Sequence, residues 1–292
     1  MIIEAGQVAV VTGAAQGLGH ALAAGLLDRG VSVVLADTAT ERLQTTAETF
    51  TAGGGRVLPV ITDVSDAAGV HTLASRTVEH FGRIDMIVNN AGISGGGQPL
   101  WQTDPQDWQR VLAVNLLGVV HGIQAFVPHL VRAGTGHVVN IASLAGLAAV
   151  PFAGVYCASK HAVVAISETL RRELEAMGLP IGVTVACPGL VRTPMAEGLF
   201  TLAHADDDVL AEHLPAHLSM GQLRVQLKGM IADPIEPEVA AERILAAVET
   251  NRLYALTHGD FEEQARQRAE GILAALDDRR RSDNHVGTAG DE

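Results

Sequence analysis

The sequence predicts a single α/β domain built on a doubly wound, seven-stranded parallel sheet with helices on both faces. Two observations carry this prediction: short apolar runs recur along the chain, and segments with helical period lie between them. A run of consecutive apolar residues indicates a strand buried on both faces, as in parallel sheets. Strands that alternate with helices indicate βαβ units, whose crossovers cover both faces of the sheet. The expected strands lie at residues 8–11, 31–36, 57–61, 86–88, 138–141, 183–186 and 253–256.

The composition narrows the class of protein. The 292 residues are 48% hydrophobic, 18% charged and only 3% aromatic, which describes a soluble chain with a large aliphatic core. A formal net charge of −13 argues against nucleic acid as a partner, because phosphate backbones bind clustered Lys and Arg. The two cysteines, Cys157 and Cys187, have neither a disulfide framework nor metal-ligand spacing, and we expect Cys157 to pack as a small apolar residue.

The start of the chain and the length of its apolar runs indicate where in the cell the protein is expected. The first residues lead directly into the first expected strand, without a basic segment followed by a long apolar stretch. No apolar segment reaches the roughly 18 residues that a membrane helix needs. We therefore expect a cytoplasmic protein that makes no contact with a membrane.

The domain boundaries follow from the rhythm of strands and helices. We expect one domain over residues 1–280. Within it, residues 194–232 form a long insertion of mixed apolar and acidic character, which is typical of a lid over a substrate site. Residues 281–292 are polar, and we expect them to form a disordered tail.

Three glycines, Gly13, Gly17 and Gly19, lie between the first expected strand and the first helix. Glycine permits positive φ and close backbone approach, and the free N–H groups at the start of a helix attract a pyrophosphate. The spacing is GxxxGxG instead of the GxGxxG of the general dinucleotide fingerprint. Because any tight strand-to-helix turn favours glycine, the turn indicates a dinucleotide site only together with other residues.

Asp37 follows the second expected strand. A carboxylate at that place accepts hydrogen bonds from the adenosine ribose of NAD and repels the 2′-phosphate of NADP. Neither Gln16 nor Thr38 supplies a cation for such a phosphate, and we expect Arg42 on a solvated helix face. The sequence therefore favours NAD over NADP.

Tyr156 and Lys160 are four residues apart, so on a helix they share one face. A free phenol has a pKa of about 10, whereas an acid–base catalyst works best when its pKa is near the operating pH. An ammonium about 4 to 5 Å away, at an effective dielectric of about 20, contributes roughly the 3 to 4 kcal/mol that such a shift needs. We therefore expect Lys160 to lower the pKa of the phenol. Ser143 ends the fifth strand, where its hydroxyl could donate to a substrate carbonyl.

These residues occur in the order of a known family. The chain resembles the short-chain dehydrogenases/reductases over roughly residues 5–260, at Thr12-Gly13…Gly17…Gly19, Asp63, Asn89-Asn90-Ala91-Gly92, Asn115, Ser143, Tyr156-x-x-x-Lys160 and Pro188-Gly189 with Thr193. The resemblance implies a Rossmann fold and hydride transfer with a nicotinamide cofactor. It further implies that Ser143 orients the substrate and that Tyr156 transfers the proton. It implies that Lys160 also binds the nicotinamide ribose, and that Asn115 holds a water that links Lys160 to solvent.

The resemblance also implies the cofactor site and an assembly. The expected NAD-binding residues are Gly13, Gln16, Gly17, Leu18, Gly19, Asp37, Asp63, Val64, Asn90, Ala91, Gly92, Tyr156, Lys160, Pro188, Gly189, Val191 and Thr193. Family members commonly form tetramers through two long helices, expected here at 106–132 and 155–177, so we expect a homo-oligomer, either a tetramer or a dimer. We expect no metal site: His213 and His217 are four residues apart, but Pro215 lies between them and no third ligand is evident.

The residues expected to wall the substrate pocket are apolar, and nothing among them resembles an Arg clamp for a carboxylate or phosphate. They are Ile93, Leu144, Val150, Phe152, Leu190 and Met195. The predicted function is therefore an NAD-dependent oxidoreductase that acts on a neutral, fairly hydrophobic secondary alcohol or its ketone.

Two alternatives stay open. One is an NADPH-dependent ketoreductase acting on acyl thioesters, against which Asp37 and the acidic insertion argue. The other is a non-catalytic dinucleotide-binding regulator, because fold does not imply function. Such a regulator would be expected to lose Tyr156, Lys160 or Ser143, and all three are present.

Overall fold

The computed structural model describes residues 2–197, 234–259 and 262–286 of the chain. Two compact units are distinguished, Met1–His258 and Gly259–Glu292. Helix α11 (Glu262–Val286) belongs to the second unit. The division therefore falls earlier than the expected domain end at residue 280, and a helix covers residues 281–286, where we expected the tail to begin. Of the expected lid, only residues 194–197 lie within the described part.

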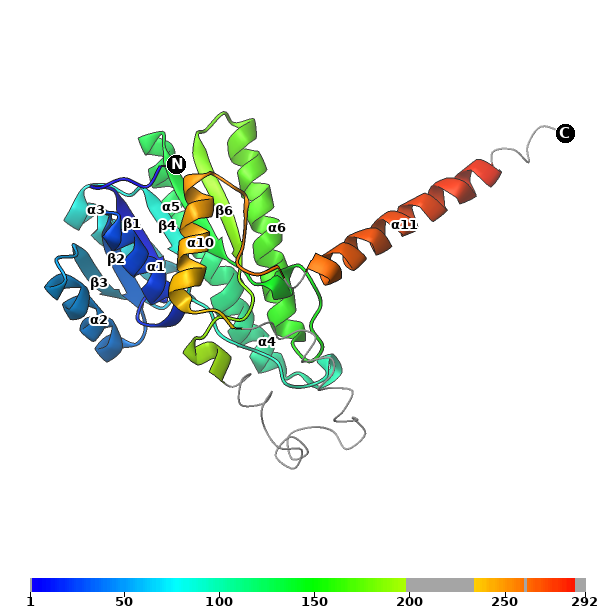
Figure 1. Ribbon diagram of the computed structural model, residues 1–292, viewed down its shortest axis with the longest axis horizontal. Coiled ribbons are helices and arrows are strands. Elements are labelled where there is room, and N and C mark those ends of the chain that lie inside the picture. Colours follow the sequence, from blue (N-terminus) through cyan, green and yellow to red (C-terminus); the bar gives the residue numbers. More distant parts are fainter. Residues whose placement is uncertain (1, 198–233, 260–261, 287–292) are drawn as a thin grey trace, which may run out of the picture. The chain divides into compact units, whose positions relative to one another are not determined.

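A seven-stranded sheet forms the centre of the first unit (Figure 1), as the alternation of apolar runs predicts. Its strands are β1 (Val8–Thr12), β2 (Ser32–Asp37), β3 (Val57–Ile61), β4 (Met86–Asn89), β5 (Gly136–Ile141), β6 (Ile181–Cys187) and β7 (Tyr254–Leu256). The strand order is β3-β2-β1-β4-β5-β6-β7, and every neighbouring pair is parallel. The doubly wound parallel sheet is confirmed.

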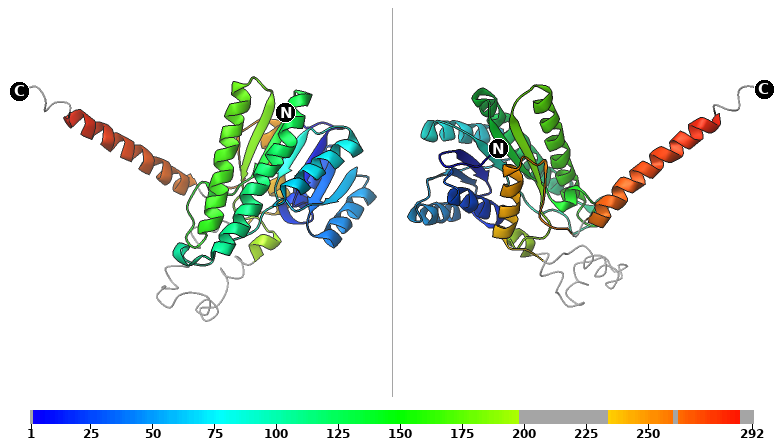
Figure 2. Two further views of the ribbon diagram at one scale, coloured as in Figure 1. Left: turned by 180° about the vertical axis from the view of Figure 1, so that it is seen from behind. Right: turned by 45° about the horizontal axis from the view of Figure 1, so that its top comes forward.

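Helices cover both faces of this sheet (Figure 2). One apolar cluster joins the sheet to α1 (Gly17–Asp28), α2 (Thr40–Ala52) and α10 (Pro237–Glu249). The other joins it to α3 (Ala67–Phe81), α5 (Gly118–Ala133) and α6 (Gly154–Ala176). Because successive side chains of a strand point to opposite faces, Val138 and Val139 of β5 enter different clusters, and the strand is buried throughout. Short 3₁₀ turns lie at Leu100–Gln102 and Leu144–Gly146.

One long helical run crosses the face that holds α3, α5 and α6. Helix α4 (Pro105–Leu112) begins at Asp104, whose side chain accepts a hydrogen bond from the Gln106 amide. A π-helical turn at Ala113–Leu117 joins α4 to α5 without a break, and the run ends at Gly134, whose φ is 67°. The two long helices expected at 106–132 and 155–177 are therefore present, at 105–133 and 154–176.

Within the described residues, one helix, Pro105–Ala133, is long and apolar enough to cross a membrane by length and composition alone. The sequence analysis expected no such segment, and this expectation was wrong. The physical reason is that part of this helix belongs to the core: α5 packs on α3, β4 and β5, and Phe126 and Leu130 are fully buried there. Packing on a sheet selects the same composition as lipid does.

The strand order reverses direction between β1 and β4, which are neighbours although β2 and β3 lie between them in the sequence. In parallel sheets, ligands bind beyond the carboxyl ends of the strands at such a reversal. The glycine turn follows β1, and Asn90 follows β4. Residues far apart in the sequence therefore meet at one edge of the sheet.

Candidate active site

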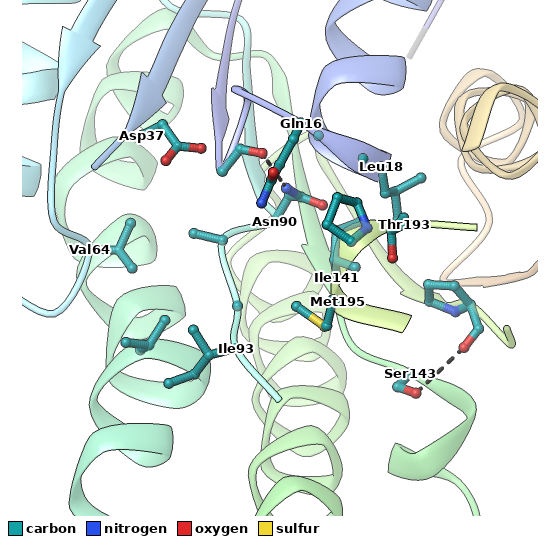
Figure 3. Close-up of a pocket in the computed structure, with 18 of the residues that line it drawn as sticks. Gln16, Leu18, Asp37, Val64, Asn90, Ile93, Ile141, Ser143, Thr193 and Met195 are labelled. Carbon is teal, nitrogen blue, oxygen red and sulfur yellow. Dashed lines mark hydrogen bonds between the residues drawn. The ribbon is translucent and has the colours of Figure 1, made fainter. Parts of the chain in front are cut away.

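A cavity of about 510 Å³ opens at the carboxyl ends of the strands. It is lined by every residue that we expected to bind the cofactor, together with Ser143, Ile93 and Met195. In Figure 3, Asp37 lies toward one end and Ser143 toward the other, with Asn90 between them. Strand β2, the β4 loop and the end of β5 thus contribute to one elongated site.

The glycine turn is shaped by close backbone contacts. Gly13 and Gly17 have φ of +64° and +57°, in the left-handed region that favours glycine. A Cβ on Gly19 would lie only 2.1 Å from the Gly13 carbonyl oxygen. The Asn90 amide group donates to the Thr12 carbonyl at 2.7 Å and so ties the β4 loop to this turn. A side chain at Gly19 is therefore excluded by the backbone itself.

Helix α1 begins directly after this turn. The side chain of Gln16, its N-cap residue, makes no capping hydrogen bond within the described chain and is bonded to Arg42 instead. The first amides of a helix lack partners within the helix and carry the positive end of its dipole. The turn and α1 together therefore suit the pyrophosphate of a dinucleotide.

Asp37 ends β2 and is half-buried. Its carboxylate accepts hydrogen bonds from the backbone amides of Ala15, at 3.1 Å, and Ala39, at 3.0 Å. A carboxylate has about four acceptor positions, so it retains acceptors for two ribose hydroxyls. The negative charge is thereby fixed beside the glycine turn.

Arg42 was expected on a solvated helix face, away from the cofactor. Its side chain is exposed, but its guanidinium donates to the Gln16 side chain, beside the glycine turn. Arg42 therefore lies on a solvated face as expected, but its guanidinium also contacts Gln16, a residue of the cavity wall. Arg42 is the residue at position 3 of α2, and the start of that helix follows Asp37 closely, which is why its long side chain reaches the turn.

Tyr156 and Lys160 lie on α6, at the Ser143 end of the cavity. Lys160 is only 4% exposed, and its ammonium donates to the Ile141 carbonyl at 2.9 Å. The ammonium nitrogen lies 5.7 Å from the centre of the Tyr156 ring. Ser143 accepts a hydrogen bond from the Ala145 amide at 3.1 Å, which fixes its side chain at the end of β5.

Burial controls the ionisation of these groups. Burial raises the pKa of Tyr156, and hydrogen bonding by Ser143 opposes this rise. Burial lowers the pKa of Lys160 to about 8. The expectation that Lys160 lowers the phenol pKa is therefore not met in this structure. The lysine loses its charge before a phenol with a raised pKa ionises, so no ammonium is left to assist that ionisation.

Asn115 lies in the π-helical turn and is fully buried, but it does not line the cavity. Its Oδ1 accepts from the Ile93 amide at 2.8 Å, and its Nδ2 donates to the Ile93 carbonyl at 3.0 Å. Nδ2 also approaches Ser159 Oγ at 3.2 Å, and Ser159 donates to the Tyr156 carbonyl. Asn115 therefore connects the β4 loop with the helix that carries the tyrosine. Its expected water-holding role stays a prediction.

Four expected substrate residues do not line the cavity, and their own contacts explain this. Leu144 is buried against Gly189, where a Cβ would lie 3.0 Å from the leucine side chain. The backbone amide of Val150 donates a hydrogen bond to the Cys157 sulfur. Phe152 has φ of 63°, and its carbonyl accepts a hydrogen bond from the Gly97 amide. The Leu190 carbonyl accepts from the Ile235 amide.

Seven further residues line the cavity that the sequence analysis did not assign to the site. They are Thr38, Ala39, Thr62, Val114, Ile141, Ala142 and Pro194. All but Val114 are sequence neighbours of predicted residues at strand ends, so adjacency would have found them. Val114 comes from the π-helical turn, where it directly precedes the predicted Asn115. No group of three or more His, Cys, Asp or Glu in the described ranges could hold a metal ion, and His213 and His217 lie outside those ranges.

Similarity to known proteins indicates the family to which the chain belongs. The family model described as short chain dehydrogenase matches residues 7–202. The chain belongs to the short-chain dehydrogenase family. A crystal structure of a short-chain dehydrogenase from Burkholderia phymatum in complex with NAD superimposes on this short-chain dehydrogenase with a TM-score of 0.81. The two chains are 36% identical, and the match covers 94% of this chain and 97% of that one.

Two curated relatives carry more specific names. The 2-(R)-hydroxypropyl-CoM dehydrogenase of Xanthobacter autotrophicus is 38% identical over 208 residues, which are 70% of this chain and 82% of the relative. The 1-deoxy-11-beta-hydroxypentalenate dehydrogenase of Streptomyces avermitilis is 42% identical over 193 residues, 65% of this chain and 71% of that protein. This short-chain dehydrogenase is therefore an oxidoreductase, similar to enzymes named for the hydroxyl compounds that they oxidise.

We expect Lys160→Met to stabilise the folded protein at pH 7 while abolishing activity. The folded protein holds the Lys160 pKa at about 8, below its ordinary value of 10.5, so folding with the ammonium buried is unfavourable. The cost is fully present below pH 8 and disappears as the pH rises to 10.5. Allowing for the lost bond to Ile141, the gain at pH 7 is on the order of 2 kcal/mol.

Urea unfolding at pH 7 and at pH 10 measures this gain. The pH 10 measurement is the control, because there the advantage of Lys160→Met over the wild type is much smaller. Equal destabilisation of the variant at both pH values would show that the ammonium is not held at a cost.

Proposed function

We propose that this short-chain dehydrogenase transfers a hydride between NAD(H) and a neutral, fairly hydrophobic secondary alcohol or its ketone, with Tyr156 as the acid–base group. One observation carries the proposal: the cavity has an acceptor for ribose hydroxyls at the Asp37 end and a tyrosine, a serine and a buried lysine at the other. The similarity to an NAD complex supports the cofactor class. The two relatives named for hydroxyl compounds support the reaction class.

The nicotinamide dinucleotide supplies the hydride chemistry when it is bound. Residues of the chain bind the cofactor, orient the substrate and transfer the proton. The glycine turn and the start of α1 bind phosphate, and Asp37 accepts hydrogen bonds from ribose. The Ser143 hydroxyl orients the substrate oxygen, and Tyr156 Oη carries the proton that this oxygen gains or loses. Because the phenol pKa is raised, Tyr156 is a neutral proton donor at pH 7, which suits ketone reduction.

The walls of the cavity near Ser143 support a neutral substrate. Ile141 and Ala142 directly precede Ser143, and Ile93 and Met195 also line the cavity, all with apolar side chains. Lys160 is the only cation among the described lining residues, and its ammonium already donates to a backbone carbonyl. A carboxylate or phosphate on the substrate would find no bidentate partner there.

The alternatives are weaker. A non-catalytic regulator has no need of Ser143, Tyr156 and Lys160, and these three line one cavity. A ketoreductase that uses NADPH has one observation in its favour, because Arg42 lies beside Gln16, where it could reach a 2′-phosphate. Asp37 opposes that phosphate. The balance between the two side chains therefore decides the cofactor, and we propose NAD.

We further propose a cytoplasmic homo-oligomer without nucleic-acid or membrane contact. A shallow apolar groove between α5 and α6 supports assembly, with Val120, Ile123, Ala165, Ile166 and Leu170 among its lining residues. These are the two long helices that we expected to form the subunit interface. A tetramer or dimer would cover the apolar surface that α5 leaves exposed.

Turnover on a panel of secondary alcohols tests the function. We expect oxidation of 1-phenylethanol, cyclohexanol or 2-octanol with NAD, and reduction of the matching ketones with NADH at pH 7. L-lactate and 3-hydroxybutyrate should be at least 100-fold poorer substrates, because their carboxylates find no partner. Tyr156→Phe should lower turnover by at least 1,000-fold while NADH binding, measured by fluorescence, stays within about threefold.

Tyr254→Phe is the matched control, because Tyr254 is exposed and bonds Glu168 at the surface. It should leave turnover unchanged. Activity confined to the hydroxy acids would contradict the proposed substrate class, and full activity of Tyr156→Phe would contradict the role of the phenol.

We expect Asp37 and Arg42 to have opposite effects on the preference for NAD over NADP. We expect Asp37→Ala to weaken NADH binding about tenfold and to tighten NADPH binding, because the repulsion of the 2′-phosphate is removed. Adding Arg42→Ala to Asp37→Ala should reverse the gain in NADPH affinity. Fluorescence titration with both reduced cofactors measures this, with Arg56→Ala as a control for removal of a distant cation. Tighter NADPH than NADH binding by the wild type would contradict the preference for NAD.

A further inference from the structure

A chain of buried polar side chains joins the sheet to the catalytic helix below the cavity. Asn89 Nδ2 donates to Asn140 Oδ1 at 2.8 Å, and Asn140 Nδ2 donates to Ser167 Oγ at 2.9 Å. Ser167 Oγ then donates to the Val163 carbonyl at 2.6 Å. The three side chains are 3%, 0% and 0% exposed. None of them lines the cavity, and the proposed reaction assigns them no role.

The position of this polar chain in the sheet is fixed by strand register. Asn89 of β4 and Asn140 of β5 are directly paired, so their side chains lie on the same face. That face belongs to α5 and α6, since Ile87 and Val138, two residues earlier on each strand, pack there. Helix α5 makes room at Gly122, where a Cβ would lie 1.9 Å from Asn89 Oδ1. The amide groups of Asn89 and Asn140 therefore occupy space in the core that apolar side chains could also occupy.

Buried polar groups in an apolar core are costly unless they are paired, so such a chain calls for an explanation. Beyond Ser159 and Lys160 near its start, the rest of the buried face of α6 is apolar, with Val163, Val164, Leu170 and Leu174. Apolar contacts are non-directional and fix the height and rotation of a helix weakly. The hydrogen bond from Asn140 to Ser167, at 2.9 Å, is directional and crosses from β5 to α6, so it holds the helix at one register on the strand.

This register bears directly on the reacting groups. Lys160 and Ser167 are seven residues apart, two turns along the same face of α6. Asn140 is adjacent to Ile141, whose carbonyl accepts the Lys160 ammonium at 2.9 Å. Asn89 is adjacent to Asn90, which ties the β4 loop to the glycine turn. One polar chain thus connects the β4 loop, the carbonyl that holds Lys160 and the helix that carries Tyr156.

We propose that Asn140, bridging Asn89 and Ser167, is a positioning residue that sets the register of α6 on the sheet and thereby places Lys160 and Tyr156 for the reaction. It touches neither substrate nor cofactor. Its effect passes through the Lys160–Ile141 hydrogen bond. This inference rests on the proposed function only for its kinetic consequence, because the register itself is a property of the folded chain.

The test compares Asn140→Leu and Ser167→Ala with two matched variants. Leu has the same branching and number of side-chain heavy atoms as Asn, although it is larger, and it removes the hydrogen bonds of Asn140 to both partners. Ser167→Thr keeps the hydroxyl and serves as the conservative rescue. Val138→Ala, on the same strand and face but two residues further from the site, removes core volume without touching the polar chain. If Asn140→Leu does not fold, the comparison of Ser167→Ala with Ser167→Thr is sufficient to test the proposal.

Hydrogen–deuterium exchange over residues 160–170 gives a readout that needs no turnover. We expect the amides of this segment to exchange at least fivefold faster in Asn140→Leu and Ser167→Ala, and at the wild-type rate in Ser167→Thr and Val138→Ala. The double variant should exchange no faster than the faster single variant, because both remove the same chain. Unchanged exchange in both single variants, or equal acceleration by Val138→Ala, would overturn the proposal even if no alcohol is turned over.

The pH profile of ketone reduction gives the kinetic readout. Loss of register removes the carbonyl that stabilises the Lys160 ammonium, so the alkaline limb, expected near pH 8 in the wild type, should move down by at least 0.5 unit. We expect kcat to fall at least fivefold at pH 7 in the same two variants. Cys187 of β6 also faces Lys160, but burial raises its pKa to about 12, so it is neutral throughout this range. A profile superimposable on that of the wild type would contradict the positioning role.

Discussion

The hydrogen bond between the buried Lys160 ammonium and the Ile141 carbonyl is the contact on which the rest of the site depends. It joins α6, which carries the tyrosine, to β5, which leads to Ser143. Burying an ammonium is unfavourable, and the lowered pKa of about 8 expresses that cost. A pKa of about 8 nevertheless leaves the group mostly charged at neutral pH, where the ammonium donates to the Ile141 carbonyl. The charge is therefore held in place at the expense of folding stability, as functional sites often require.

Close backbone approach makes this arrangement possible. The glycine turn excludes side chains at Gly19, and α5 lies near the sheet at Gly122, where Asn89 enters. Small residues at these points let polar groups from β4, β5 and α6 meet within bonding distance. The parallel sheet then brings the ends of β1, β2, β4 and β5 to one edge, so a single cavity collects groups that are more than a hundred residues apart in sequence.

The sequence was sufficient for the elements and for most of the residues that line the cavity at the strand ends, because period and strand-end position determine both. The sequence was not sufficient where the length of a side chain, or its contacts with other residues, determines whether that side chain reaches the cavity. Arg42 reaches Gln16 although it lies on an exposed helix surface. Leu144 and Phe152 follow the right strand, but their own contacts keep them off the cavity wall. The phenol pKa was misjudged because a distance between charges was considered without the burial of both groups.

The most direct test concerns the ionisation of Tyr156 itself. The chain has only two tyrosines, so Tyr254→Phe leaves Tyr156 as the single phenol that titrates in an ultraviolet absorbance measurement. Burial raises its pKa above the ordinary phenol value, so Tyr156 should ionise after Lys160 has lost its proton. A transition between pH 7 and 8 in the folded protein would contradict this account, because it would require the lysine charge to outweigh the burial of the phenol.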